Sequence, residues 1–228
     1  MPEHNEIYAS QAHKYHQLIA KQPDLTAYIN EIRPISGLDI VDLGAGTGRF
    51  TTGLAVEASS IAALDASEAM LQINANRLGE AGLTNWRTQA ADHRSLPLGD
   101  NTADLIISGW SICYLCSTDN PDWELNIRQI LGEARRVLRD GGTMIIMETL
   151  GTGHETPCAP DFLTGYYEAL VNEHGFSHRW IRADYEFEDA GQAEELTRFF
   201  FGDELADHVA QQHITKLPEC AGIWWLHL

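Results

Sequence analysis

Residues 41–50, VDLGAGTGRF, decide how this chain folds. The apolar run 38–43 predicts a strand, and it leads directly into glycines at alternate positions. Gly44 permits a tight turn, and Gly46 lets the backbone approach a ligand closely, because neither residue carries a Cβ. A helix expected over residues 47–57 would present free backbone N–H groups to a ligand anion. The stretch therefore predicts a nucleoside-type ligand at the end of the first strand.

The rest of the chain repeats this alternation of strand and helix. We expect further strands at residues 60–64, 86–90, 103–108 and 143–148. We expect helices over residues 68–80 and 121–139. The strands are apolar on both faces, which is typical of a parallel sheet covered by helices on both sides.

The two ends of the chain predict additions to this core. The first 32 residues indicate two helices that are separated at Pro23. The last third predicts, in order, a helix at 162–173, a strand at 178–187, a helix at 189–212 and a strand at 222–228.

The charge of the chain restricts its partners. Fifteen Lys and Arg residues stand against 33 Asp and Glu, a net charge of −18. Such a surface repels nucleic-acid phosphates and anionic lipid headgroups. No window approaches the run of about 20 apolar residues that crosses a bilayer, and the first residues lack the basic start of a secretory signal. We therefore expect a cytoplasmic protein that binds neither nucleic acid nor membrane; its oligomeric state is not predicted.

The glycine spacing distinguishes between classes of cofactor. A dinucleotide site typically needs G-x-G-x-x-G/A, whereas the third position here is Arg49, whose side chain would obstruct the pyrophosphate. No Gly-Lys-Ser/Thr follows, so there is no P-loop. Asp65 lies 21 residues after Gly44, at the end of the second predicted strand. A carboxylate there can accept hydrogen bonds from both hydroxyls of a ribose.

Several segments, in this order, resemble blocks of the class I S-adenosylmethionine-dependent methyltransferases, particularly their small-molecule branch. They are the glycine turn, Asp65-Ala66-Ser67 with Met70, Ala91-Asp92-His93, Ser108-Gly109-Trp110 and the turn 138–142. In that last turn Asp140 stands where proline is common in the family. The resemblance covers roughly residues 5–150 well, and the last third only in outline.

The resemblance implies S-adenosylmethionine as cofactor and S-adenosylhomocysteine as product. It implies that Asp65 binds the ribose, that Asp92 meets the adenine amino group, and that Asp42, Gly44 and Gly46 form the cofactor turn. The other residues it places at the cofactor are Ala66, Ser67, Met70, Ala91 and His93 around the adenine, Ser108 and Gly109 beside the methionine part, and Tyr8 and Tyr15 in N-terminal helices that close over it.

The resemblance also implies the architecture. We expect one α/β domain, doubly wound and Rossmann-like, with a seven-stranded, mostly parallel sheet, an antiparallel last strand and an N-terminal helical lid. Residues 1–36 would lie over the cofactor, and residues 37–150 would form the cofactor-binding core. Residues 151–228 would supply the substrate cover and an edge strand.

The chemistry of such a site depends mainly on positioning, because the methyl group is already activated by its positively charged sulfur. A base is needed only if the acceptor must lose a proton. His154, in the loop after the strand at 143–148, is the candidate. The aromatic residues expected at the acceptor are Phe162, Tyr166, Tyr167 and Trp180, whereas the run 199–201 and Trp224-Trp225 are interpreted as core.

Cys113-x-x-Cys116 is interpreted as a pair of free thiols after a strand rather than at the start of a helix, and we expect no metal site.

The sequence thus predicts an enzyme that transfers a methyl group to an oxygen, nitrogen or carbon atom of a small-molecule acceptor. The segment 108–111, SGWS, lacks the Asn/Asp-Pro-Pro-aromatic block of nucleobase amine methyltransferases and the carboxylate of metal-dependent catechol enzymes. Two alternatives stay open. One is a dinucleotide-binding oxidoreductase, which Arg49 disfavours, and the other is a non-catalytic module that binds S-adenosylmethionine.

Overall fold

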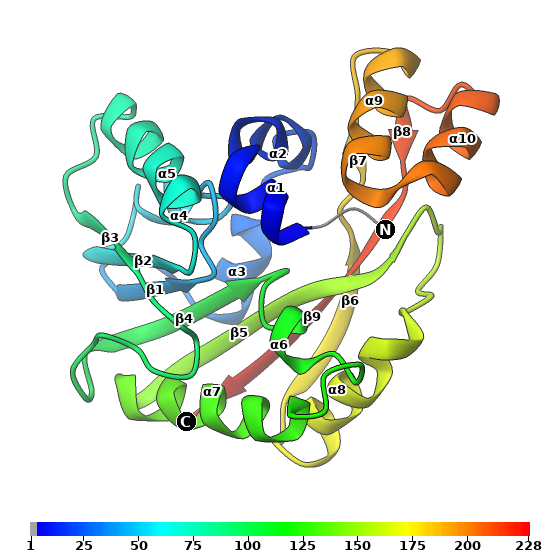
Figure 1. Cartoon of the computed structure of the whole chain (residues 1–228). Coiled ribbons are helices and arrows are strands. Elements are labelled where there is room, and N and C mark those ends of the chain that lie inside the picture. The colour runs from blue at the N-terminus through cyan, green and yellow to red at the C-terminus, as the bar shows by residue number, and fades with distance from the viewer. Residues whose placement is uncertain (1–3) are drawn as a thin grey trace.

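A seven-stranded sheet forms the centre of the computed structural model, which describes residues 4–228 (Figure 1). Its strands, in spatial order, are β3 (Trp86–Ala90), β2 (Ser60–Asp65), β1 (Asp39–Leu43), β4 (Ala103–Gly109), β5 (Leu138–Thr152), β9 (Glu219–His227) and β6 (Ser177–Arg182). Strands β1 to β5 are parallel, and β9 pairs antiparallel with both β5 and β6. The predicted doubly wound sheet with an antiparallel last strand is confirmed.

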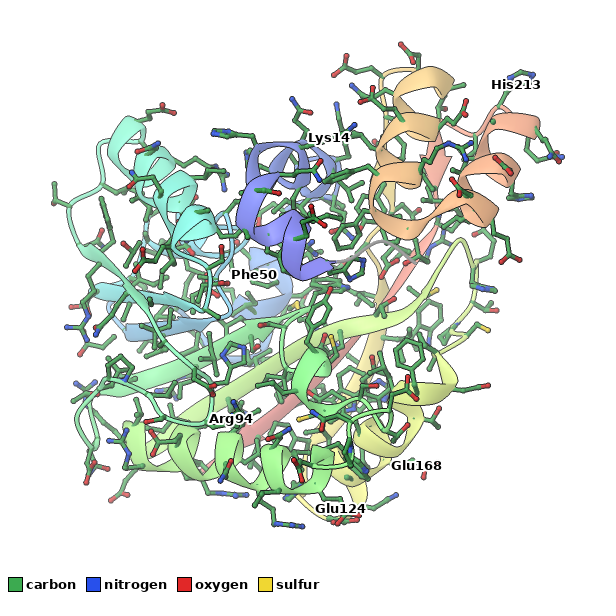
Figure 2. All side chains as sticks on the ribbon, viewed as in Figure 1. Lys14, Phe50, Arg94, Glu124, Glu168 and His213 are labelled. Carbon is green, nitrogen blue, oxygen red and sulfur yellow. The ribbon has the colours of Figure 1, made fainter. Side chains whose placement is uncertain are left out.

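Both faces of the sheet are buried. Along β1, Val41 and Leu43 face one apolar cluster while Ile40 faces another, as the period of two requires. The first cluster is covered by α7 (Trp123–Val137) and α8 (Asp161–Asn172), low in Figure 1. The second is covered mainly by α3 (Thr26–Ile32) and α4 (Thr51–Leu54), with Leu78 of α5 (Glu68–Glu80). In Figure 2 Phe50 points into the interior, whereas Glu124 and Glu168 point outward from α7 and α8.

The N-terminal segment forms three helices rather than the two predicted. Helices α1 (His4–Ser10) and α2 (Ala12–Ile19) pack against α5, and α2 also contacts α9 (Ala190–Phe201). These two helices lie over the end of the sheet at which β1 and β2 finish (Figure 1).

Four further predictions are wrong in their bounds. The strand expected at 143–148 extends over Leu138–Thr152 as β5, so the turn expected at 138–142 lies within it. The helix expected at 47–57 shrinks to α4, because Gly46 and Gly48 have φ of 51° and 90°. The helix expected at 189–212 is split into α9 and α10 (Asp203–Gln211) at Gly202, whose φ is 94°. The strand expected at 178–187 becomes β6 and the short β7 (Tyr185–Glu186), which pairs with β8 (Lys216–Leu217) away from the main sheet.

The two cysteines of the C-x-x-C pair form the ends of a short helix, α6 (Cys113–Cys116), so the expectation that they would not open a helix is wrong. Within residues 4–228, no three His, Cys, Asp or Glu side chains are grouped so that they could hold a metal ion. None of the helices in that range has the length and apolarity needed to cross a membrane.

Candidate cofactor and acceptor site

Two adjoining cavities open where β1, β2 and β4 end. The smaller, of about 220 Å³, is lined by the glycine turn, the end of β2 and the loop after β3. The larger, of about 410 Å³, lies between α1, α2, α6, the end of β5 and the C-terminal end of α9. Tyr8, Tyr15, Trp110 and Tyr114 line both cavities. A molecule in one cavity would therefore lie next to a molecule in the other.

The glycine turn forms the floor of the small cavity. Gly44 has φ of 75°, and a Cβ at this position would overlap the side chain of Ser111. Ser111 Oγ in turn shares a hydrogen bond of 2.7 Å with His93 Nε2. Burial lowers the pKa of His93 to about 4, so its ring is neutral at neutral pH. Glycine is therefore required at position 44 for backbone conformation and for space.

Asp65 presents a carboxylate to the small cavity. Its Oδ2 accepts a hydrogen bond of 2.9 Å from Gly46 N, and its Oδ1 accepts one of 2.8 Å from Ser67 N. Burial raises the pKa of Asp65, and these backbone donors oppose the rise. Each oxygen has a second lone-pair direction for a ligand hydroxyl. The residue thus fits the ribose of an adenosyl cofactor, as expected from its place after β2.

Asp42 lies beneath the turn and lines neither cavity. It is 1% exposed and accepts a hydrogen bond of 2.5 Å from Thr51 Oγ1, which itself accepts one of 2.9 Å from Asn74 Nδ2. Burial raises the pKa of Asp42 to about 7. Through these hydrogen bonds Asp42 links β1 to α4 and α5 and so positions the glycine turn above it.

Asp92 borders the small cavity, but its carboxylate is already paired. Arg94 Nη2 lies 2.6 Å from Oδ2, and the Arg94 Nε and backbone N donate to Oδ1 at 2.9 and 2.8 Å. The guanidinium lowers the pKa of Asp92 to about 2. A ligand amino group would share this carboxylate with Arg94.

Most of the residues expected at the cofactor surround one space. Those that line the small cavity are Tyr8, Tyr15, Gly44, Gly46, Asp65, Ala66, Met70, Ala91, Asp92, His93 and Gly109. Asp42, Ser67 and Ser108 do not. Ser67 Oγ accepts from Met70 N at the start of α5 and donates to Tyr8 O, which links α1 to the core. Ser108 is buried within β4.

Sequence reasoning did not place Ser111, Tyr114 and Leu115 at the site, and it included Trp110 only as the end of the block that begins at Ser108, without a role of its own. Trp110 has φ of 50°, a left-handed conformation that is strained for a bulky side chain. Its ring stacks against the Arg49 guanidinium, with Cζ 4.1 Å from the ring centroid. An aromatic residue directly after a strand-ending glycine is the signal that could have identified it.

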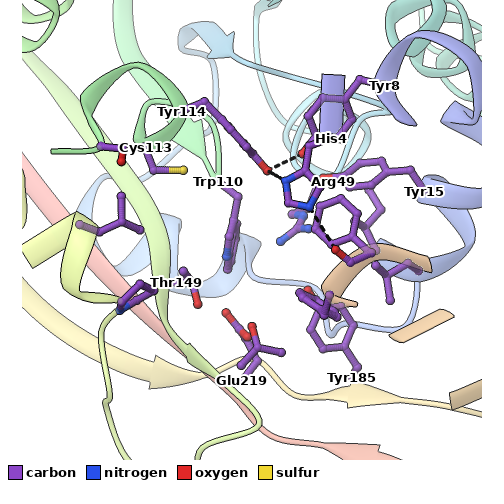
Figure 3. Close-up of a pocket in the computed structure, with 18 of the residues that line it drawn as sticks. His4, Tyr8, Tyr15, Arg49, Trp110, Cys113, Tyr114, Thr149, Tyr185 and Glu219 are labelled. Carbon is purple, nitrogen blue, oxygen red and sulfur yellow. Dashed lines mark hydrogen bonds between the residues drawn. The ribbon is translucent and has the colours of Figure 1, made fainter. Parts of the chain in front are cut away.

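The larger cavity holds two polar groups that lack partners. Glu219 is 1% exposed, and neither of its carboxylate oxygens has a hydrogen-bond partner among the described residues. The buried Nη1 of Arg49 also has none there. Burial raises the pKa of Glu219, and the nearby side chains of Thr152 and Thr149 and the charge of Arg49 act in the opposite direction. Both residues line the same space (Figure 3).

Three side chains, those of Tyr8, Tyr114 and His4, form a chain of hydrogen bonds at the boundary of the two cavities. Tyr8 Oη and Tyr114 Oη share a hydrogen bond of 2.6 Å, and Tyr114 Oη is 3.1 Å from His4 Nδ1. His4 Nε2 is 3.0 Å from the carbonyl oxygen of Phe200, and their rings stack. This hydrogen-bonded chain, visible in Figure 3, links α1, α6 and α9.

Several residues expected at the acceptor lie elsewhere. His154 is exposed and lines neither cavity. Tyr166 and Tyr167 are buried in the core, where Tyr167 stacks on Trp224, and Trp180 is exposed on β6. Phe162 does line the larger cavity. Phe200 and Phe201, expected in the core, line it as well, because α9 ends at Gly202 with these rings turned to the site.

Comparisons with known proteins agree with this geometry. Residues 41–146 match a family model described as a methyltransferase domain. The chain is 31% identical over 135 residues to demethylmenaquinone methyltransferase of Clavibacter sepedonicus, a match that covers 59% of this chain and 49% of the relative. It is 31% identical over 116 residues to phosphoethanolamine N-methyltransferase 1 of Triticum aestivum, covering 50% and 22%. The chain thus spans half or less of these two relatives.

The fold has solved counterparts as well. A SAM-dependent methyltransferase from Aquifex aeolicus superposes with a TM-score of 0.60 and 16% identity, covering 91% of this chain and 92% of that one. At this identity the likeness concerns the fold.

Proposed function

We propose that this chain, whose residues 41–146 match a methyltransferase domain, is a class I S-adenosylmethionine-dependent methyltransferase that transfers a methyl group to an oxygen, nitrogen or carbon atom of a small molecule. The observation that carries the proposal is the pairing of the two cavities. A glycine turn with a ribose-type carboxylate borders the first, and the second adjoins it behind shared aromatic side chains.

The small cavity is the place for the cofactor. Asp65 would accept hydrogen bonds from the ribose, Met70 and Ala91 would border the adenine, and Gly44 and Gly109 would leave room for the rest. When bound, S-adenosylmethionine would supply a methyl group on a positively charged sulfur. This electrophile is already activated, so only an acceptor that must lose a proton would need a base.

The chain's own residues would position the acceptor and exclude water. Tyr8 and Tyr114 close the boundary of the two cavities from α1 and α6, and their hydrogen bond orients both rings. Holding two reactants in near-attack geometry can lower a barrier by about 7–11 kcal/mol. Tyr15 and Trp110, which line both cavities, would border the place where cofactor and acceptor meet.

The size of the larger cavity favours a small acceptor. About 410 Å³ falls within the range of typical metabolite pockets, roughly 300–1,000 Å³. The names of the two relatives refer to small molecules, demethylmenaquinone and phosphoethanolamine. The strongly acidic composition disfavours a nucleic-acid acceptor.

The proposal is tested by following the methyl group itself. The purified chain would be incubated with S-adenosylmethionine labelled in the methyl group and a panel of small amines, phenols, quinols and carboxylic acids. We expect label in at least one small product with the native chain and with Asp140→Ala, which removes an exposed carboxylate far from the cavities. We expect none with Asp65→Ala. Cofactor binding without transfer to any acceptor would instead favour a non-catalytic module.

A further inference from the structure

The larger cavity contains an acidic and a basic side chain, Glu219 and Arg49, that do not pair with each other. Glu219 begins β9, and Arg49 follows the glycine turn after β1, so the fold brings them to one space from distant parts of the chain. Neither carboxylate oxygen of Glu219 has a hydrogen-bond partner among residues 4–228, and nor does the buried Nη1 of Arg49. Arg49 instead stacks on Trp110.

Leaving such groups unpaired is costly. Transfer of an ionised side chain from water into a protein costs several kcal/mol unless partners replace the lost hydration. Glu219 is 1% exposed, yet Thr149 and Thr152, which line the same cavity, make no hydrogen bond of normal geometry to its oxygens. The ordinary solution, an ion pair between the two residues, is absent from the described part of the chain. This is the pattern of a site arranged for the polar groups of a ligand.

The remaining walls favour a ligand with a compact apolar body. The aromatic side chains that line the cavity are Tyr15, Trp110, Phe162, Tyr185, Phe200 and Phe201. Aromatic faces attract a cation that is already bound by a carboxylate. A simple amine would satisfy Glu219 but would add a second positive charge near Arg49. A simple acid would satisfy Arg49 and repel Glu219.

We propose that the acceptor is a small zwitterion, with an ammonium group bound by Glu219 and an acidic group, carboxylate or phosphate, bound by Arg49. This inference rests on the proposed function, since it assigns the larger cavity to the acceptor. Glu219 and Arg49 are then specificity-determining residues, because a molecule lacking either charge leaves one of them buried and unpaired. A site built in this way discriminates strongly against the incomplete ligand.

The test uses calorimetric titration of the whole chain at pH 7.5, with and without saturating S-adenosylhomocysteine. The probes are phenylalanine, 6-aminohexanoate and phosphoethanolamine, compared with phenethylamine and 3-phenylpropionate, which carry one charge each. We expect at least one zwitterion to bind at least about tenfold more tightly than both singly charged probes. Comparing the affinity for phosphoethanolamine with the affinities for the two amino acids shows whether Arg49 prefers a phosphate or a carboxylate.

Variants then assign each end of the ligand. Glu219→Gln should weaken binding of the best zwitterion at least about tenfold and leave the affinity for 3-phenylpropionate unchanged. Arg49→Gln should weaken binding of the same zwitterion at least about tenfold and leave the affinity for phenethylamine unchanged. Glu168→Gln, on the outer face of α8, is the matched control. Far-UV circular dichroism and an unchanged affinity for S-adenosylhomocysteine establish that each variant is folded.

The two proposals fail in different ways. Loss of the zwitterion preference, or a Glu219→Gln chain that binds zwitterions as the native chain does, would overturn the inference while S-adenosylhomocysteine still binds. Failure to bind S-adenosylhomocysteine at all would overturn the proposed function. The titrations without that ligand would in that case still decide whether the cavity selects zwitterions.

Discussion

The two cavities of this molecule are built in opposite ways. In the small cavity the two carboxylates and the imidazole have partners within the protein: Asp65 accepts from two backbone N–H groups, Asp92 is paired with Arg94, and His93 shares a hydrogen bond with Ser111. In the larger cavity the two charged groups, Glu219 and Arg49, have unpaired atoms. The difference indicates one site that is rigid before a ligand arrives and one that the ligand completes.

The cavities also differ in where their residues come from. The small cavity uses strand ends and the turns that follow them, so its residues lie close to recognisable spacings. The larger one assembles side chains from α1, α2, α6, α9 and β9. This division fits the proposed function, in which the small cavity binds the cofactor and the larger one sets the specificity for the acceptor.

The largest effect is expected at the floor of the rigid cavity. Gly44→Ala places a Cβ against Ser111 and also strains a residue with φ of 75°. Together these should lower the free energy of unfolding by about 3 kcal/mol and abolish binding of S-adenosylhomocysteine. Gly37→Ala is the control, since Gly37 has φ of 74° and no atom lies within 4 Å of the place its Cβ would take. Chemical denaturation and calorimetry measure both changes; equal effects of the two substitutions would contradict the steric account.

The support beneath the turn should show in the dependence of stability on pH. Burial raises the pKa of Asp42 to about 7, so the unfolded state releases this proton first and stability falls as pH rises from about 4 to 7. The asparagine side chain of Asp42→Asn cannot ionise. Between pH 5 and 7 the free energy of unfolding of this variant should therefore fall by about 2 kcal/mol less than that of the native chain.

Urea denaturation at pH 5, 6 and 7 measures this difference. Burial also raises the pKa of Glu148 to about 7. Its contribution to the pH dependence of the free energy of unfolding is the same in both proteins, so it cancels in the difference between them. Parallel curves for the native chain and Asp42→Asn would show that Asp42 ionises normally.

The boundary between the cavities should respond more weakly. Tyr114→Phe removes the hydroxyl that bonds to Tyr8 and faces His4. One hydrogen bond contributes about 0.5–1.5 kcal/mol, so we expect the affinity for S-adenosylhomocysteine to fall about two- to tenfold with little change in stability. Tyr28→Phe, on α3 outside both cavities, should bind as the native chain does. Equal affinities of the two variants for S-adenosylhomocysteine would contradict a role for the Tyr114 hydroxyl at the boundary of the cavities.

The smallest effect is expected at His154. This histidine follows β5 but is exposed and lines neither cavity. Its replacement by alanine should change stability by less than about 0.5 kcal/mol and leave methyl transfer unchanged. A large loss of turnover would restore it as a base that reaches the acceptor through a different loop conformation.

The rigid cavity could be predicted because its determinants are local. Gly44, Gly46 and Asp65 are set by turn geometry and strand ends, which follow from spacing along the chain. The helix at residues 68–80 likewise has an N-cap at Ser67, and its bounds are as predicted. Prediction from local sequence was less accurate at residues 47–57, where positive φ at Gly48 delays the start of the expected helix and leaves the short α4.

The larger cavity could not be predicted because its residues meet only through tertiary packing. Nothing near Glu219 in the sequence marks it as buried or as part of a site. Phe200 and Phe201 resembled core, and only the break at Gly202 turns them toward the site. Tyr114 lies on a four-residue helix that packs on α7 and α8 and is linked to α1 by the hydrogen bond to Tyr8, so its position depends on tertiary contacts.

The most direct test of the account is calorimetric titration of S-adenosylmethionine and NAD into the native chain, Asp65→Ala and Asp140→Ala. We predict that S-adenosylmethionine binds the native chain and Asp140→Ala equally, that Asp65→Ala weakens it by about a hundredfold through loss of two charge-assisted hydrogen bonds, and that NAD does not bind. Binding of NAD alone, or S-adenosylmethionine binding that does not depend on Asp65, would contradict the account.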